Sequence, residues 1–126
     1  MLRWKLFRSR WFALAWFIMT CVLFFLPGSD LPHDQWLSDL HFDKLVHIGL
    51  FAGLIFLCRS AFNLRWHYYH ALLLSAALAY GYLVEVIQRE WIPNRSFDLY
   101  DVLADMAGSV LGLVVWLWVY KKNKPL

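Results

Sequence analysis

The stretch VLADMAGSVLGLVVWLWVY, residues 102–120, decides the fold, because it is long and apolar enough to cross a bilayer as one helix. Three more apolar stretches precede it, at about residues 11–26, 45–62 and 71–88. The whole chain is 61% hydrophobic and 17% charged, with a mean hydropathy of +0.49, which leaves too little polar surface for a soluble domain. Residues 1–126 therefore predict a single all-α domain, an integral membrane bundle of four transmembrane helices.

Charged residues divide between the two ends of these stretches. If the chain crosses the bilayer four times, nine of the 12 Lys and Arg residues share the face that holds both termini. All nine Asp and Glu residues fall on the opposite face, together with Lys44, Arg89 and Arg95. Because Lys and Arg in short loops stay in the cytoplasm, we expect an N-in/C-in topology. The basic residues flank apolar segments, where they attract anionic lipid, so the expected partner is the lipid bilayer and not nucleic acid.

Small residues spaced four apart indicate which helix faces meet. The last stretch carries Ala104, Gly108 and Gly112 at this spacing, and such stripes let helix backbones approach closely in lipid. The stripe predicts either packing within the bundle or a homodimer through the Ala104/Gly108/Gly112 face. Asp101 and Asp105 continue the stripe, so both side chains are expected to point into the bundle. The second and third stretches are joined by a short turn, so we expect them to be antiparallel neighbours.

A polar cluster is expected inside the acidic face of the bundle. His47, Glu85 and Asp105 each lie about one helical turn from the helix ends, so they can share one layer near the headgroups. The polar residues expected around this layer are Asp43, Lys44, Gln88, Arg95, Asp98 and Asp101. Ionisable side chains in a membrane usually face a cavity or a partner, and they mark a functional site. The alternative is structural, with interhelical hydrogen bonds that contribute about 0.6 kcal/mol each.

The residue types in this cluster narrow its chemistry without fixing it. Three carboxylates and one histidine would suit a hard cation such as Mg²⁺, Ca²⁺ or Mn²⁺ better than Zn²⁺. No ligand spacing of a known metal motif is present, so we assign no metal and no cofactor from the sequence. The sequence also has no Ser beside a base at a motif spacing and no Gly-rich phosphate loop. We therefore assign no catalytic residue, and the sequence leans against an enzyme.

Several short segments follow one another in a definite order: DKLVH at 43–47, EVIQ at 85–88, PNR at 93–95, DLYD at 98–101 and DMAG at 105–108. In this order and at these spacings they resemble the VanZ-like family of small bacterial membrane proteins. The family commonly has Asn where this chain has Asp105, so a carboxylate here replaces a carboxamide.

The resemblance implies a place and a set of binding residues. The family takes its name from a member linked to resistance to the glycopeptide teicoplanin. The resemblance therefore implies a multi-pass cell-envelope protein of the bacterial cytoplasmic membrane, with a link to glycopeptide tolerance. The polar motif residues of the family correspond here to Asp43, Lys44, His47, Glu85, Gln88, Arg95, Asp101 and Asp105.

Proton or ion movement is one function that stays open, although the helix centres carry no chain of ionisable groups of the kind that a relay uses. Two others have more support. The first is a non-enzymatic protein that binds a lipid, a cell-wall intermediate or another membrane protein through an outward-facing polar cluster. The second is a membrane-embedded hydrolase or transferase acting on a lipid-linked phosphate at the outer leaflet. In that enzyme His47 would be the base or nucleophile, oriented by Glu85 or Asp105. Lys44 and Arg95 would hold the phosphate.

Overall fold

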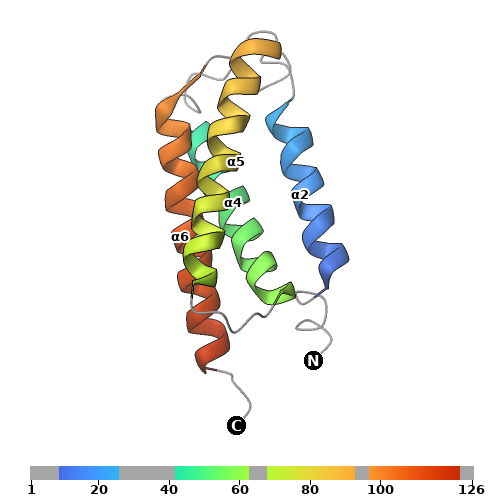
Figure 1. The fold of residues 1–126 in the computed structure, drawn as a ribbon, viewed down its shortest axis with the longest axis vertical. Helices are drawn as coiled ribbons and strands as arrows, with labels where there is room; N and C mark the ends of the chain where they lie inside the picture. The colour runs from blue at the N-terminus through green and yellow to red at the C-terminus, as the bar shows by residue number, and fades with distance from the viewer. Residues whose placement is uncertain (1–8, 26–41, 63–67, 93–96, 123–126) are drawn as a thin grey trace.

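Four helices make up the part of the chain that the computed structural model describes, namely residues 9–25, 42–62, 68–92 and 97–122. They are α2 (Arg10–Phe24), α4 (Phe42–Ala61), α5 (Tyr69–Trp91) and α6 (Leu99–Lys122), and these described ranges contain no strand (Figure 1). The predicted all-α class is confirmed.

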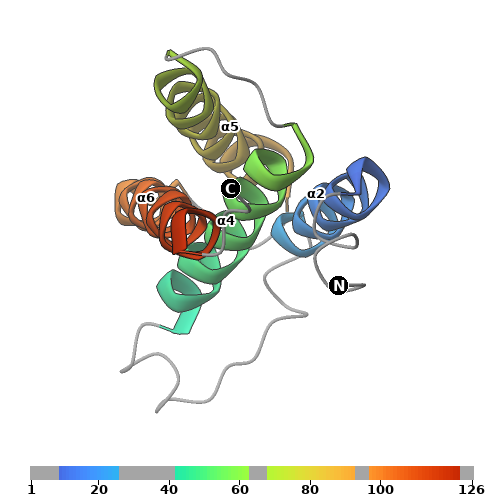
Figure 2. The same ribbon diagram turned by 90° about the horizontal axis from the view of Figure 1, so that it is seen from below.

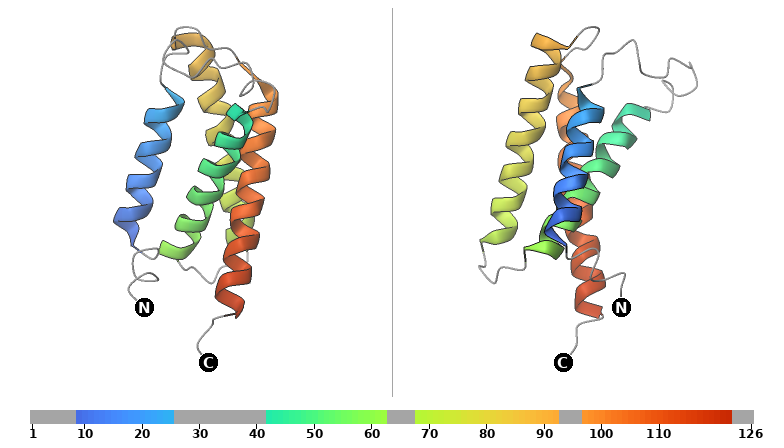
Figure 3. Two further views of the ribbon diagram at one scale, coloured as in Figure 1. Left: turned by 180° about the vertical axis from the view of Figure 1, so that it is seen from behind. Right: turned by 90° about the vertical axis from the view of Figure 1, so that its right-hand side faces the viewer.

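The helices alternate in direction, so the bundle has two chemically different ends (Figures 1 and 3). At one end α2 and α5 finish and α4 and α6 begin; we call it the acidic end, because Glu85 and Asp101 lie near it. At the other end α4 and α6 finish, and we call it the arginine end, after Arg59. α2 also begins there, so the start of the first described helix and the end of the last one lie on the same side of the bundle.

α4 and α6 run in the same direction and form the most extensive helix pair. Two glycines of α6 allow this, since a Cβ at Gly108 would overlap the backbone of Ile48 and one at Gly112 would overlap that of Ala52. The predicted small-residue stripe is therefore buried, and α4 of the same chain covers it. A homodimer through the Ala104/Gly108/Gly112 face would have to displace α4, and self-association stays a prediction.

α4 is also packed on its other side, by α2. The ring of Trp16 lies where a Cβ on Gly53 would be, and its Nε1 donates to the carbonyl of Leu50 at 2.9 Å. α5 packs mainly on α6, and its backbone comes close to that of α4 at few points. α4 and α5 are antiparallel as predicted (Figures 1 and 2), and they meet mainly through side chains such as the rings of Phe51 and Tyr80, whose centroids are 5.5 Å apart. The glycines of α6 let α4 approach that helix more closely than α5.

Polar residues extend the helices beyond the apolar stretches that the sequence predicts. α5 runs three residues past 88, and α6 begins at Leu99 instead of 102. Asp98 caps α6, since its Oδ1 accepts a hydrogen bond from the N–H of Tyr100 at 2.9 Å. Hydropathy marks the part of a helix that fits in lipid, whereas capping and backbone hydrogen bonds decide where the helix ends.

Three of the four helices are long and apolar enough to span a membrane, at Lys44–Ala61, Tyr69–Trp91 and Leu99–Val119. α2 has 15 residues and a length of about 22 Å, which is shorter than a hydrocarbon core of about 30 Å. Its outward face is nevertheless apolar, with Trp11 and Val22 largely exposed. The structure is thus compatible with a membrane protein that has three helices of full spanning length and one shorter apolar helix.

Candidate functional site

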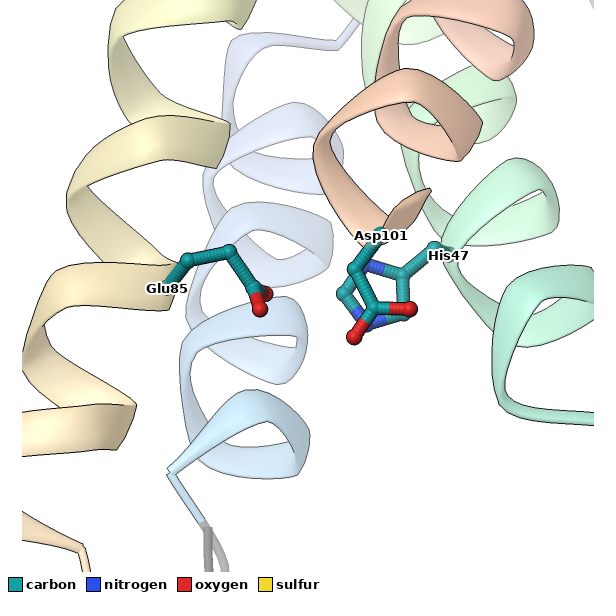
Figure 4. A group of neighbouring side chains, drawn as sticks. All are labelled: His47, Glu85 and Asp101. Carbon is teal, nitrogen blue, oxygen red and sulfur yellow. The ribbon is translucent and has the colours of Figure 1, made fainter. Parts of the chain in front are cut away.

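The predicted polar cluster forms at the acidic end from the side chains of three helices. His47 comes from α4, Glu85 from α5 and Asp101 from α6, and the three side chains point toward one another (Figure 4). All three are buried. We define the acidic cluster by its six described side chains: Lys44, His47, Glu85, Asp98, Asp101 and Asp105.

His47 is held on two sides. Its Nδ1 lies 2.6 Å from Oδ1 of Asp105, and its ring stacks on Phe24 with centroids 4.7 Å apart. An ionised carboxylate can only accept, so the proton of a neutral imidazole sits on Nδ1. Nε2 then carries a lone pair, and it lies 3.6 Å from Oδ2 of Asp101. This is the geometry of a base or a metal ligand that a carboxylate orients.

Glu85 is fully buried but only half satisfied. Its Oε1 accepts a hydrogen bond from the N–H of Asp98 at 3.0 Å, whereas Oε2 has no hydrogen-bond partner among the described residues. The same holds for Oδ2 of Asp105, which packs 2.6 Å from the position of a Cβ on Gly81. Buried carboxylate oxygens are costly without a partner, so these two atoms mark a place where a cation or a donor belongs.

Lys44 supplies the ammonium of the acidic cluster. Its Nζ pairs with Oδ2 of Asp98 and lies 3.0 Å from Oδ1 of Asp101. The second contact has the distance of an ion pair without the angles of a hydrogen bond, so we treat it as electrostatic. Lys44 is thus engaged with carboxylates, which weakens its predicted role as a phosphate ligand. Among the described side chains of the cluster, four carboxylates face this one ammonium.

The other predicted site residues are Asp43, Gln88 and Arg95. Gln88 donates from Nε2 to the carbonyl of Phe24 at 2.6 Å, so it ties α5 to the end of α2 and does not face the carboxylates. The side chain of Asp43 and the whole of Arg95 lie outside the described residues, so their predicted part in the site stays a prediction.

α2 contributes contacts that the sequence analysis missed. Phe24 stacks on His47 and accepts from Gln88, whereas the sequence predicts only an apolar transmembrane stretch here. The hydroxyl of Tyr80 lies 2.9 Å from Oγ1 of Thr20 and 3.2 Å from Sγ of Cys21. An inward-facing Gln at a helix end was the available signal, and its partner is a backbone carbonyl that no side-chain pattern reveals.

A second buried group lies at the arginine end. The guanidinium of Arg59 lies 3.9 Å from the ring centroid of Trp116 and 4.9 Å from that of Tyr69, and its Nε donates to Nε2 of His70 at 3.2 Å. We call these four residues the arginine cluster. In the sequence Arg59 counts as a flanking cytoplasmic charge. Its position in the last turn of α4 is the signal that could have placed it inside the bundle.

The comparison with known families covers both clusters. A family model described as VanZ/LLP1 matches residues 3–120, which is nearly the whole chain. The chain belongs to the VanZ/LLP1 family. No curated protein and no solved structure matches it. The resemblance found in the sequence is confirmed, and the motif residues His47, Glu85 and Asp101 of this VanZ/LLP1 protein meet at one site.

Proposed function

We propose that this VanZ/LLP1 protein spans the bacterial cytoplasmic membrane four times, with N-in/C-in topology and the acidic cluster facing outward. The alternating helix directions and the charge division along the sequence support this topology. The exposed apolar face of α2 supports a fourth span, because a bilayer thins locally around a short hydrophobic helix.

Single-cysteine labelling tests this topology in a background without Cys21 and Cys58. On intact cells, a membrane-impermeant maleimide is expected to label Trp91→Cys at the acidic end. Phe62→Cys at the arginine end is expected to react only after the membrane is opened. The reverse pattern would contradict the proposed orientation.

Within this topology, the protein binds a lipid or a lipid-linked cell-wall intermediate at the acidic cluster and performs no catalysis. The observation that carries this proposal is Oε2 of Glu85, which is fully buried beside His47 without a hydrogen-bond partner among the described residues. A purely structural cluster would pair its buried polar atoms. The side chains of Lys44 and Asp98 are partly exposed, so a polar headgroup can approach at the acidic end.

Glycopeptide tolerance tests this function in cells, because the family resemblance connects the chain to teicoplanin-type tolerance. A susceptible strain that expresses the wild-type chain is expected to survive more teicoplanin than the empty strain. His47→Ala is expected to abolish this protection, and His70→Ala, at the arginine end, is the matched control that retains it. Immunoblots of the membrane fraction check that all three chains accumulate equally. Full protection by His47→Ala would overturn the proposed role of the acidic cluster.

The 2.6 Å contact between His47 and Asp105 favours a second candidate, a hydrolase or transferase of a lipid-linked phosphate. A carboxylate at Nδ1 orients the imidazole so that Nε2 can take a proton from an attacking water or alcohol. Proteoliposomes containing a polyprenyl diphosphate separate the two candidates. Phosphate release that His47→Ala abolishes supports the enzyme, whereas saturable binding without release supports the binding protein.

A further inference from the structure

Glu85 and Asp101 each use one carboxylate oxygen for a contact with Asp98 or Lys44, and the second oxygen is left for another partner. Oε1 of Glu85 accepts from the N–H of Asp98, and Oδ1 of Asp101 lies 3.0 Å from Nζ of Lys44. The second oxygen of Asp101 faces Nε2 of His47 at 3.6 Å. One ligand atom from each of His47, Glu85 and Asp101 lies within 4.8 Å of the other two, and Figure 4 shows the side chains converging from three helices.

The spacing of these atoms suits ligands around an ion better than a hydrogen-bonded network. The 3.6 Å between Nε2 of His47 and Oδ2 of Asp101 is too long for a hydrogen bond. Two atoms bound at about 2.2 Å to one ion lie about 3.1–3.6 Å apart at angles of about 90–110°. One carboxylate oxygen of Glu85 lies within 4.8 Å of a ligand atom of each of the other two residues, and its side chain points toward them (Figure 4).

Burial and charge indicate that the missing group is a cation. Glu85 and Asp105 have no exposed surface, and each has one oxygen without a hydrogen-bond partner among the described residues. Isolated buried carboxylates are strongly disfavoured unless they are paired or coordinate a metal. A free phosphate would add negative charge to a cluster that already has an excess of it. A divalent cation between His47, Glu85 and Asp101 would offset that excess.

The contact behind His47 matches the usual support of a metal ligand. Histidines that bind metals generally donate their other ring N–H to a carboxylate, which fixes the tautomer and the ring orientation. Asp105 provides that carboxylate at 2.6 Å from Nδ1, and Phe24 stacks on the ring. Asp105 is therefore a positioning residue, and Nε2 is the atom left to bind.

We infer that this end of the bundle is a divalent-cation site, with His47, Glu85 and Asp101 as its protein ligands. Two carboxylates and one imidazole suit a hard or borderline cation of the Mg²⁺ and Mn²⁺ class, with water in the remaining positions. The inference rests on the same residues as the proposed function and deepens it, since a bound cation would attract the phosphate of a lipid-linked ligand.

Manganese is the probe for the test, because free and bound Mn²⁺ differ in their electron paramagnetic resonance spectra. The full chain is reconstituted in nanodiscs of uncharged phosphatidylcholine, so that the lipid itself binds little Mn²⁺. Wild type is expected to show a saturable class of sites. Glu85→Gln removes a ligand charge with little change of shape and is expected to weaken Mn²⁺ binding at least about 100-fold, and Asp105→Asn about 10–100-fold.

Glu90→Gln is the matched control, because Glu90 is an exposed carboxylate at the same end and pairs with Arg89. It makes the same chemical change and is expected to leave Mn²⁺ binding unaltered. If Glu85→Gln fails to insert, Asp101→Asn provides the same comparison. Equal binding by wild type and the ligand variants overturns the site. Saturable binding of Zn²⁺ without saturable binding of Mn²⁺ overturns the assignment to the Mg²⁺ and Mn²⁺ class.

These experiments can contradict the cation site and the proposed function independently of each other. Loss of Mn²⁺ binding in Glu85→Gln with unchanged glycopeptide protection supports the cation site and contradicts the proposed function. Loss of protection in His47→Ala with no saturable Mn²⁺ binding by wild type supports the function and contradicts the cation site.

Discussion

The two ends of the bundle differ in the groups that surround their buried charges. At the arginine end, Arg59 is enclosed by the rings of Trp116 and Tyr69 and donates to an imidazole nitrogen, so uncharged groups meet its charge. At the acidic end, carboxylates gather around His47, and their negative charge exceeds that of the described cation beside them. At the arginine end the buried charge has a hydrogen-bond acceptor and aromatic rings around it, whereas at the acidic end one oxygen each of Glu85 and Asp105 has no hydrogen-bond partner among the described residues.

This difference separates a structural role from a functional one. A buried charge that is fully enclosed can stay in place without a ligand, and removing it leaves its surroundings unfilled. A cluster that keeps unpaired groups is destabilising by itself, and proteins carry such strain mainly at functional sites. The arginine cluster is therefore expected to contribute to stability, and the acidic cluster to reduce it in return for binding.

The largest effect on stability is expected at the close contact between α4 and α6, where Gly108 and Gly112 pack on the backbone of α4. We call this contact the glycine seam, and it connects the two ends of the bundle. Gly108→Leu would drive a side chain into the backbone of Ile48 and is expected to lower the free energy of unfolding by more than about 3 kcal/mol. Gly49→Leu is the matched control, because a Cβ at Gly49 meets nothing within 4 Å. Thermal unfolding in detergent, followed by circular dichroism, measures both. Equal melting temperatures would show that the seam does not hold the ends together.

The next largest effect is an expected gain in stability from a substitution in the buried acidic cluster. Glu85→Gln removes a buried charge with an unpaired oxygen, and without divalent cations it is expected to raise the free energy of unfolding by about 1–2 kcal/mol. The measurement is denaturant unfolding in detergent with a chelator present. A clear loss of stability would mean that the carboxylate is satisfied in the free protein, and the contrast between the two ends would fail.

Removing the buried charge at the arginine end should lower the free energy of unfolding. Arg59→Met keeps much of the side-chain bulk but removes the cation from the rings of Trp116 and Tyr69, at a cost of about 1–2 kcal/mol. A double-mutant cycle with Trp116→Leu isolates the pairwise contribution. No coupling between the two positions would contradict a stabilising arginine cluster.

The smallest effect is expected between the two ends. Tyr80→Phe removes the hydroxyl that contacts Thr20 and Cys21 and should lower the free energy of unfolding by about 0.6 kcal/mol. Tyr82→Phe, on an exposed part of the same helix, is the control and should change it very little. The two variants are compared in the same unfolding assay, where a larger loss in the control would remove the role assigned to Tyr80.

Sequence patterns predict the class of this fold because lipid restricts a spanning chain to few structures. Small residues at a four-residue spacing also predict which face of α6 is buried, although not that α4 is its partner. Spacing along one helix limits which side chains can face inward, and this predicts that His47, Glu85 and Asp105 share one layer. It contains no information on which helices pack most closely, so the close approach of α4 to α6 could not be predicted from it.

Contacts to the backbone and to aromatic rings account for what sequence reasoning missed. The partner of Gln88 is a carbonyl of Phe24, and the partner of Glu85 is the N–H of Asp98. Both partners are backbone groups, so a pattern of polar side chains in the sequence does not reveal them. Arg59 was assigned to the membrane surface because charge rules count a residue's position along the chain and not the rings around it.

The glycines of α6 also fix how α4 and α6 can slide along each other. They lie four positions apart on α6, and they meet positions that are likewise four apart on α4, Ile48 and Ala52. Sliding α6 by one helical turn, about 5.4 Å, would bring the side chain of Ala104 or of Trp116 against backbone that leaves no room for a Cβ. One axial register therefore fits both glycines, and in that register His47 meets Asp105 and Lys44 meets Asp101. The backbone contact between the two helices thus sets the height at which the side chains of the candidate site meet, before any ligand binds to them.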